Sequence, residues 1–261
     1  MSFLDDIVEI GSSAASYLSG NSLAGTLART ALLGLAVNQI TKSVTADNAK
    51  NSNTLTDIPD PQTKLQNNAD TENKIPVVYG DAFLGGSVTD AVLAEDGLTM
   101  TFCLTISEKT GKVNLGQGAD SVFTFKEPYW NGNKMVFKAD GITVDYVVDP
   151  SGNIDNGLSG LIKIWCFDGS STDPVAFSGY TNTPTDAAYT VMPGWTTSHT
   201  MSDLVFAIVQ VKYDSTHSLT SLGTITFHMS NTLTQPGDCL YDYMTNTRYG
   251  AGLDPSEIYA S

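Results

Sequence analysis

Alternating apolar and polar residues occupy most of the chain between residues 75 and 235. This period of two is typical of β-strands with one face in a core and the other in water. The clearest turn signal is Asn131-Gly132, because Asn-Gly supplies the positive φ angles of a tight hairpin turn. Strands linked by short turns predict an antiparallel β-sandwich or barrel. The strand-like segments are IPVVYG, GLTMTFCLTISE, SVFTFKEPYW, KMVFKAD, ITVDYVVD, LIKIWCF, DLVFAIVQVKYD and GTITFHMS.

Residues 1–42 have the spacing of helices instead. After a break at residues 20–22, small and aliphatic side chains follow one another along one helical face. Four of them define this face: Leu23, Leu27, Ala31 and Leu35. Such a face requires a partner, either the chain's own domain or another protein. We therefore expect an N-terminal helical arm that binds a partner through these residues.

The remaining segments differ in composition. Residues 43–74 are rich in Asn, Asp, Thr and Lys and have almost no large apolar residues, which predicts an extended polar linker. Residues 236–261 predict a short helix over 238–245, capped by Asp238, and a second helix start at Asp254-Pro255-Ser256-Glu257. The expected chain is mainly β, of the α+β class, with an N-terminal helical arm, a linker, a β domain over 75–235 and a short C-terminal helix.

The charge is strongly acidic, with 28 acidic against 13 basic residues and a formal net charge of -15. Such a chain has no long-range attraction for nucleic acid or an anionic membrane. The acidity serves solubility, or it gives a surface that lets DNA pass without binding it. The apolar run ALLGLAV is far shorter than the roughly 20 residues of a membrane-spanning helix. The first residues, MSFLDDIVEI, carry acids where a secretion signal needs bases.

No pattern for catalysis, a metal or a cofactor stands out. The three histidines are far apart, and His228 alternates with apolar neighbours as an ordinary strand residue does. The three cysteines have apolar neighbours and are interpreted as free thiols. Asp81 with Asp90, or Asp145 with Asp149, could form the carboxylate pair of a glycosidase. We interpret them as strand ends and turns, and expect no enzyme.

Two stretches, residues 74–91 and residues 192–258, go beyond a generic β protein, and three segments within them carry the pattern. The first is Ile75-Pro76-Val77-Val78-Tyr79-Gly80, followed by Gly85-Gly86. The second runs from Leu204 to Tyr213, and the third contains Tyr241-Asp242-Tyr243-Met244-Thr245-Asn246 and Tyr249-Gly250-Ala251-Gly252. Together they resemble the hub, or central tail-tip, proteins of tailed bacteriophages. The resemblance covers the two ends of the β region, whereas residues 92–190 share only the strand character.

The resemblance implies a structural virion protein at the distal end of the tail, made in the host cytoplasm. It implies a ring of copies of the chain, a homotrimer, that joins the tail tube or distal tail protein to the tip and lines the DNA passage. Other expected partners are the tape-measure protein, contacted by the N-terminal arm, and further tip or fibre proteins. The structural motif would form a domain corner from Tyr79, Gly80, Tyr241, Asp242, Tyr243, Asn246, Tyr249, Gly250 and Gly252.

Two points stay open in the sequence. Larger members of the family continue beyond this motif, so the chain is either a shorter hub subunit or one part of a divided hub. The main alternative function is a carbohydrate-binding β-sandwich module of a tail, in which Trp130, Trp165 and Trp195 would form a sugar platform. A tail lysozyme or peptidase is disfavoured because no catalytic cluster is evident.

Overall fold

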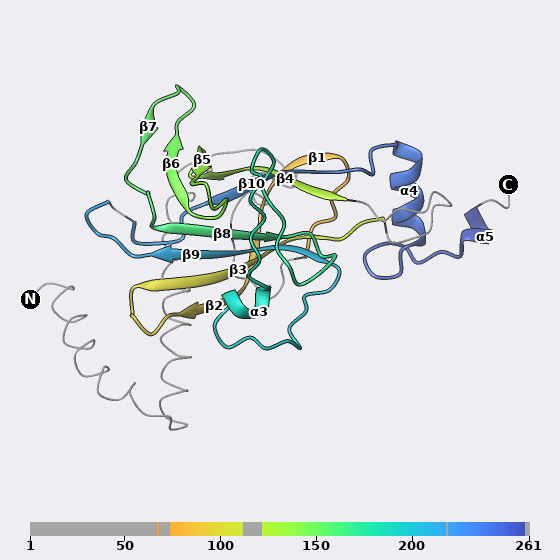
Figure 1. Ribbon diagram of the computed structural model, residues 1–261. Helices are drawn as coiled ribbons and strands as arrows, with labels where there is room; N and C mark the ends of the chain where they lie inside the picture. Colours follow the sequence, from red (N-terminus) through yellow and green to blue (C-terminus); the bar gives the residue numbers. More distant parts are fainter. Residues whose placement is uncertain (1–66, 68–73, 112–121, 218, 259–261) are drawn as a thin grey trace, which may run out of the picture. The chain divides into compact units, whose positions relative to one another are not determined.

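The computed structural model describes residue 67 and residues 74–111, 122–217 and 219–258 (Figure 1). The chain divides into two compact units, Met1–Asp57 and Ile58–Ser261, and all described residues belong to the second. The expected helical arm, with Leu23, Leu27, Ala31 and Leu35, lies outside the described residues. Of the expected linker, only Asn67 and Lys74 are described.

The described chain is mainly β, as predicted. One sheet has the strand order β1-β10-β4-β5-β6-β7 and the other β2-β3-β9-β8. Neighbouring strands in both sheets are antiparallel. The strands are β1 (Asp81–Gly85), β2 (Ser87–Leu93), β3 (Thr99–Glu108), β4 (Phe123–Trp130), β5 (Asn133–Phe137), β6 (Val144–Val148), β7 (Ile154–Asp155), β8 (Ile162–Phe167), β9 (Leu204–Lys212) and β10 (Ile225–Asn231). The helices are α3 (Ala188–Val191), α4 (Pro236–Thr245) and α5 (Pro255–Ile258).

The two sheets enclose one hydrophobic core, so the fold is a sandwich. Leu104 on β3 and Val209 on β9 belong to the same buried cluster as Phe125 on β4 and Phe227 on β10. The rings of Phe125 and Phe227 meet edge to face, with centroids 6.0 Å apart. Buried and partly buried residues alternate along β10, because every second side chain of this strand enters the core.

The four-stranded sheet is buried on its second face as well. There, a separate cluster contains Cys103, Trp165 and Phe206 from the sheet, and Ala188 and Met192 from α3 and its end. Strands covered on both faces read as nearly continuous apolar runs, which explains the segment LVFAIVQVK of β9. The short helix α3 is a finding, since the sequence analysis predicted no helix between residues 75 and 235.

The predicted hairpin at Asn131-Gly132 is confirmed. Trp130 pairs with Asn133, and the two residues between them have φ angles of 49° and 82°. Asn and Gly are the residues that adopt this left-handed conformation at least cost. The turn fixes the register of β4 and β5, and it therefore fixes which β4 side chains enter the core.

Two local predictions are wrong. The segment IPVVYG is not a strand: β1 begins at Asp81, and within 75–80 only Val77 forms an isolated bridge, with Glu108. Helix α4 begins at Pro236 after Gln235, so Asp238 is not its cap. Proline suits the first helical position, and Asp238 lies in the first turn, where the helix dipole favours an acid.

The second helix start is confirmed as α5. The Asp254 carboxylate accepts a hydrogen bond from the Ser256 N–H at 2.8 Å. In return, the Glu257 carboxylate accepts one from the Asp254 N–H at 3.2 Å. This reciprocal pair is a capping box, in which two unpaired backbone donors at a helix start are satisfied.

Asn67 is fixed to the sandwich although it lies in the segment expected to be a linker. Its Nδ2 donates to the Gly86 carbonyl at 3.1 Å, and its Oδ1 accepts from the Ile225 N–H at 2.6 Å. Gly86 connects β1 to β2 and so joins the two sheets, while Ile225 begins β10. The side chain therefore ties the chain to the point where the sheets meet.

We predict that Asn67→Ala lowers the free energy of unfolding by about 1–2 kcal/mol, because it leaves the partly buried Ile225 N–H and Gly86 carbonyl unpaired. Urea unfolding measures this. Asn156→Ala, at an exposed position of the same residue type, is the control and should change stability by less than about 0.5 kcal/mol. Equal effects of the two substitutions would contradict the anchoring role.

Candidate functional site

The first and the last of the three segments that carry the family resemblance meet at one buried carboxylate. Asp242 on α4 has an exposed fraction of 0%. Its Oδ2 accepts hydrogen bonds from the hydroxyls of Tyr79 and Tyr249, both at 2.7 Å, and its Oδ1 accepts one from the Gly111 N–H at 3.1 Å. We call these four residues the Tyr–Asp corner. Helix α4 lies beyond one end of the sheets (Figure 1), so the corner closes that end of the sandwich.

The loop after α4 is shaped to return Tyr249 to Asp242. The Asn246 side-chain oxygen accepts from the Arg248 N–H at 2.8 Å and the Tyr249 N–H at 3.2 Å, which holds a tight turn. A Cβ on Gly250 would lie 1.9 Å from the Tyr243 carbonyl oxygen, so no larger residue fits without movement. The sequence Asn-x-x-Tyr-Gly therefore has a direct geometric use.

The N-terminal half of the corner is held by Asn231 at the end of β10. Its Oδ1 accepts from the Gly80 N–H at 2.9 Å, and its Nδ2 donates to the Val78 carbonyl at 2.6 Å and the Thr110 hydroxyl at 3.0 Å. Gly80 has a φ of +69°, a conformation that glycine adopts freely. Asn231 was not among the predicted motif residues, although an Asn that ends a strand-like run is an available signal for such a cap.

The predicted motif residues contribute unequally. Tyr79, Gly80, Asp242, Asn246, Tyr249 and Gly250 all take part in the contacts described above. Tyr243 is 48% exposed, and its carbonyl accepts from the Ala251 N–H at 2.9 Å. Gly252 donates its N–H to the Asn246 carbonyl at 3.1 Å, and Tyr241 is partly buried. These last three support the loop and helix, and the predicted residues that bond the Asp242 carboxylate are Tyr79 and Tyr249.

Burial and hydrogen bonding keep the two corner tyrosines neutral. Burial is the first cause that raises the pKa of Tyr79 and of Tyr249 above the ordinary tyrosine range. The hydrogen bond to Asp242 raises both pKa values further, because a phenolate would face the carboxylate. Beside the corner, Arg248 Nε lies 2.7 Å from Glu108 Oε2. Burial raises the pKa of Glu108, and Arg248 opposes that rise.

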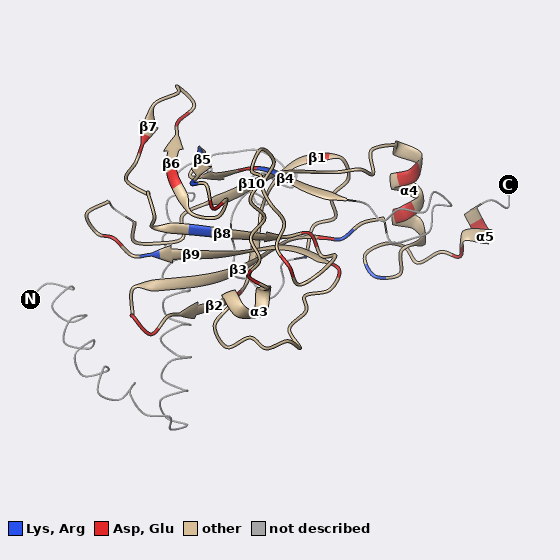
Figure 2. Ribbon diagram, viewed as in Figure 1, with Lys and Arg blue, Asp and Glu red and all other residues tan. Residues whose placement is uncertain are grey.

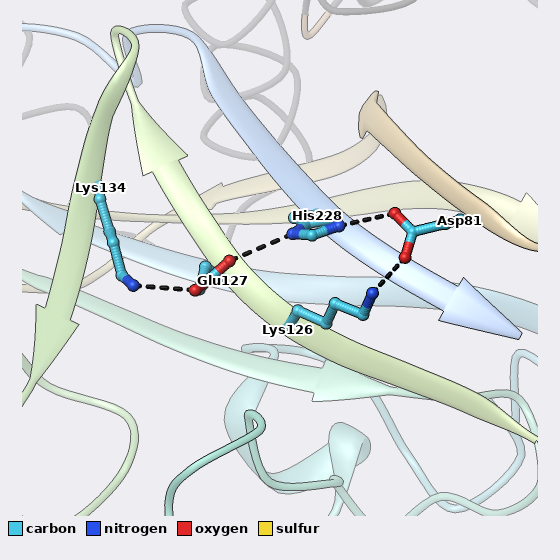
Figure 3. Close-up of polar contacts among 5 residues, drawn as sticks. All are labelled: Asp81, Lys126, Glu127, Lys134 and His228. Carbon is cyan, nitrogen blue, oxygen red and sulfur yellow. Dashed lines mark hydrogen bonds and ion pairs between the residues drawn. The ribbon is translucent and has the colours of Figure 1, made fainter. Parts of the chain in front are cut away.

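A second polar cluster crosses the outer face of the six-stranded sheet (Figure 3). Lys134 Nζ lies 2.8 Å from Glu127 Oε1, and Glu127 Oε2 lies 3.1 Å from His228 Nδ1. His228 Nε2 lies 2.7 Å from Asp81 Oδ1, and the other Asp81 oxygen pairs with Lys126. We call these five residues the charged ladder. It runs from β5 through β4 and β10 to β1, and each link joins neighbouring strands or crosses one.

A β-bulge in β4 makes the ladder possible. His228 pairs with Glu127 and Met229 pairs with Phe125, so Lys126 is the extra residue. Phe125 before the bulge and Pro128 after it are buried, whereas Lys126 and Glu127 are both partly exposed. A bulge shifts the phase of alternation, so two successive side chains can share one face. His228 was predicted to be an ordinary strand residue, and the cluster was not predicted because strand pairing creates it.

The three tryptophans of the sugar-platform alternative do not form one exposed surface. Trp165 is 5% exposed, and its indole N–H donates to Asp186 at 3.2 Å. Trp195 donates to Asp90 at 2.8 Å and packs with Trp165 on the α3 side of the four-stranded sheet. Trp130 packs against the main core and donates to the Leu222 carbonyl at 3.1 Å. Each ring is therefore used in the fold.

The carboxylates considered as glycosidase pairs either lie on different sheets or are hydrogen-bonded within a turn. Asp81 belongs to the charged ladder on one sheet, whereas Asp90 lies on β2 of the other sheet. Asp149 accepts from the Ser151 and Asn153 N–H groups, both at 2.8 Å, and so caps its own turn. Within the described residues, no group of three or more His, Cys, Asp or Glu is placed to hold a metal ion.

A scan of protein-family models found no match to the chain, and a search of curated proteins found no match either. The helices in the described part of the chain are all too short or too polar to cross a membrane.

We predict that Asp242→Ala lowers the free energy of unfolding by about 3 kcal/mol, since it leaves two tyrosine hydroxyls and one backbone N–H without their acceptor. Asp242→Asn keeps one oxygen acceptor and should cost about half as much. Asp238→Ala, on the exposed side of the same helix, is the control, with an effect below about 1 kcal/mol. Chemical denaturation separates these outcomes; similar losses at positions 238 and 242 would contradict the role of the corner.

The raised tyrosine pKa values predict a loss of stability in alkali. Unfolded tyrosines release their protons near pH 10, whereas Tyr79 and Tyr249 hold theirs to higher pH in the folded state. The contribution of these two tyrosines to the free energy of unfolding is complete below about pH 10 and falls as the pH rises beyond it. Free energies of unfolding at pH 8 and about pH 10.5 should therefore differ less in the double variant Tyr79→Phe, Tyr249→Phe than in the wild type. Tyr213→Phe, at an exposed position, is the control.

Proposed function

We propose that the chain is a structural virion protein of a tailed bacteriophage, a hub or tip component that joins the tail tube or distal tail protein to the tail tip. The supporting observation is the meeting, at Asp242, of the two ends of the β region that resemble tail hub proteins. Tyr79 comes from the first segment, and Asp242 and Tyr249 come from the last. Two short patterns matched by chance would have no reason to share a buried carboxylate.

The geometry of the corner favours a structural use of these residues. Asp242 is fully buried, and both of its oxygens accept hydrogen bonds from the chain itself. A general base must reach a proton on the substrate, and this carboxylate has none of its surface available for that. Its effect is to lock the C-terminal loop onto the segment that leads into β1. We therefore propose a role in assembly and no catalytic role.

We further propose that copies of the chain form a ring, a homotrimer, around the DNA passage. The formal charge of -15 supports this use, because an acidic wall repels the phosphates of passing DNA. Acidic positions occur on both sheets and on α4 and α5 in the described part of the chain (Figure 2). The N-terminal arm, through Leu23, Leu27, Ala31 and Leu35, would contact the tape-measure protein or a neighbouring subunit.

Immunogold labelling of tailed phage particles that carry the chain tests this proposal. The antibody is raised against the folded sandwich, residues 75–258, and pre-absorption with the purified chain is the control. We expect gold only at the tail end opposite the head. Gold along side fibres would favour the carbohydrate-binding alternative, and a glycan array would then test it directly. Particles without any gold would contradict a virion role.

A further inference from the structure

His228 lies between two carboxylates, and a neutral histidine cannot donate a hydrogen bond to both of them. Its Nε2 lies 2.7 Å from Asp81 Oδ1, and its Nδ1 lies 3.1 Å from Glu127 Oε2. A neutral imidazole carries one N–H, and its other nitrogen presents a lone pair. That lone pair would face a carboxylate oxygen at contact distance. Only the protonated ring donates to both carboxylates.

The surrounding groups keep both carboxylates ionised. Lys126 is the first cause that lowers the pKa of Asp81, and Lys134 is the first that lowers the pKa of Glu127. His228 lowers both pKa values further. Neither carboxyl group therefore supplies a proton to a neutral imidazole near pH 7. The charge on the histidine itself decides whether both contacts exist.

We propose that protonated His228 is a clasp that fastens the edge strand β1 to β4 across β10, and that loss of its proton opens the clasp. The charged groups that face His228 are Asp81 from β1 and Glu127 from β4. Lys126 of β4 forms an ion pair with Asp81, and Lys134 of β5 forms one with Glu127 (Figure 3). The proposal is independent of the virion role, because it concerns the purified chain alone.

The ring stack beside the clasp acts in the same direction. Phe83 of β1 lies directly opposite His228 in the sheet register, and their rings stack with centroids 4.2 Å apart and planes 11° apart. A cation above an aromatic face is attracted to it, so protonation strengthens this contact as well. Both contacts between His228 and β1 therefore weaken when the ring becomes neutral.

Strand β1 is the element that the loss of the His228 contacts affects most. It has five residues, and within the described chain it pairs only with β10. Asp81 begins the strand directly after Gly80. An edge strand of this length depends on side-chain contacts for its hold on the sheet. Opening the clasp thus raises the rate at which β1 separates from β10.

The test is backbone hydrogen exchange of the full chain at pH 5.5 and pH 8, expressed as protection factors so that the intrinsic effect of pH is removed. Over the range from pH 5.5 to pH 8, the contribution of the clasp is present where the ring is protonated and is lost where the ring is neutral. We expect the protection of β1 amides to fall about fivefold over this range in the wild type. In His228→Gln it should be low and equal at both pH values.

His217→Gln is the matched control. His217 Nδ1 also lies 3.1 Å from a carboxylate oxygen, that of Asp214, but in the loop that follows β9. This variant should keep the wild-type pH dependence in β1. Equal protection of β1 at both pH values in the wild type would overturn the proposal, as would a full pH dependence in His228→Gln. If His228→Gln does not fold, Asp81→Asn decides, because a full pH dependence in that variant also overturns it.

Discussion

The buried carboxylate of Asp242 is the constraint on which the arrangement of the corner depends. An ionised carboxylate removed from water costs several kcal/mol unless hydrogen-bond donors replace the water. Here the donors are Tyr79, Gly111 and Tyr249, which lie far apart in the sequence. The docked position of helix α4 therefore brings together the segment before β1 and the residues that follow β3. One side chain thus joins three separate parts of the chain at this end of the sandwich.

The outer faces of the two sheets are covered in different ways. The four-stranded sheet is covered on its second face by α3 and the loops around it, and its strands β8 and β9 carry buried apolar side chains on both faces. The six-stranded sheet instead presents a charged surface, for which the bulge at Lys126 turns two successive β4 side chains outward. Charged side chains next to a free sheet edge also oppose pairing with another chain. The two sheets therefore differ in the surface that they offer to a neighbour.

Periodicity in the sequence predicted the elements better than it predicted their contacts. The hairpin at Asn131-Gly132 and the capping box at Asp254 depend on residues close in the chain, and both were confirmed, as was the antiparallel β character of the described chain. The charged ladder depends on which strands pair and on a bulge, which no local pattern reveals. Segment 75–80 looked like a strand because of its apolar residues, but side-chain bonds from Asn231 hold it instead. Asp242 was selected through the family resemblance, and only the fold shows what it binds.

These contacts converge on strand β1, which is held at both ends and in the middle. At its start, Gly80 is bonded to Asn231, and Tyr79 is bonded to Asp242. At its end, the Gly86 carbonyl accepts from Asn67. Between them, the ring of Phe83 stacks on His228 of β10, while Asp81 at the start of the strand contacts β4 and β10 through the ladder. Because β1 is short and lies at a sheet edge, its own ladder of backbone bonds is a weak attachment. A pull on the chain from the N-terminal side would reach Asn67 before it reached β1. The sandwich is thus reinforced at the point where the described chain leads into β1.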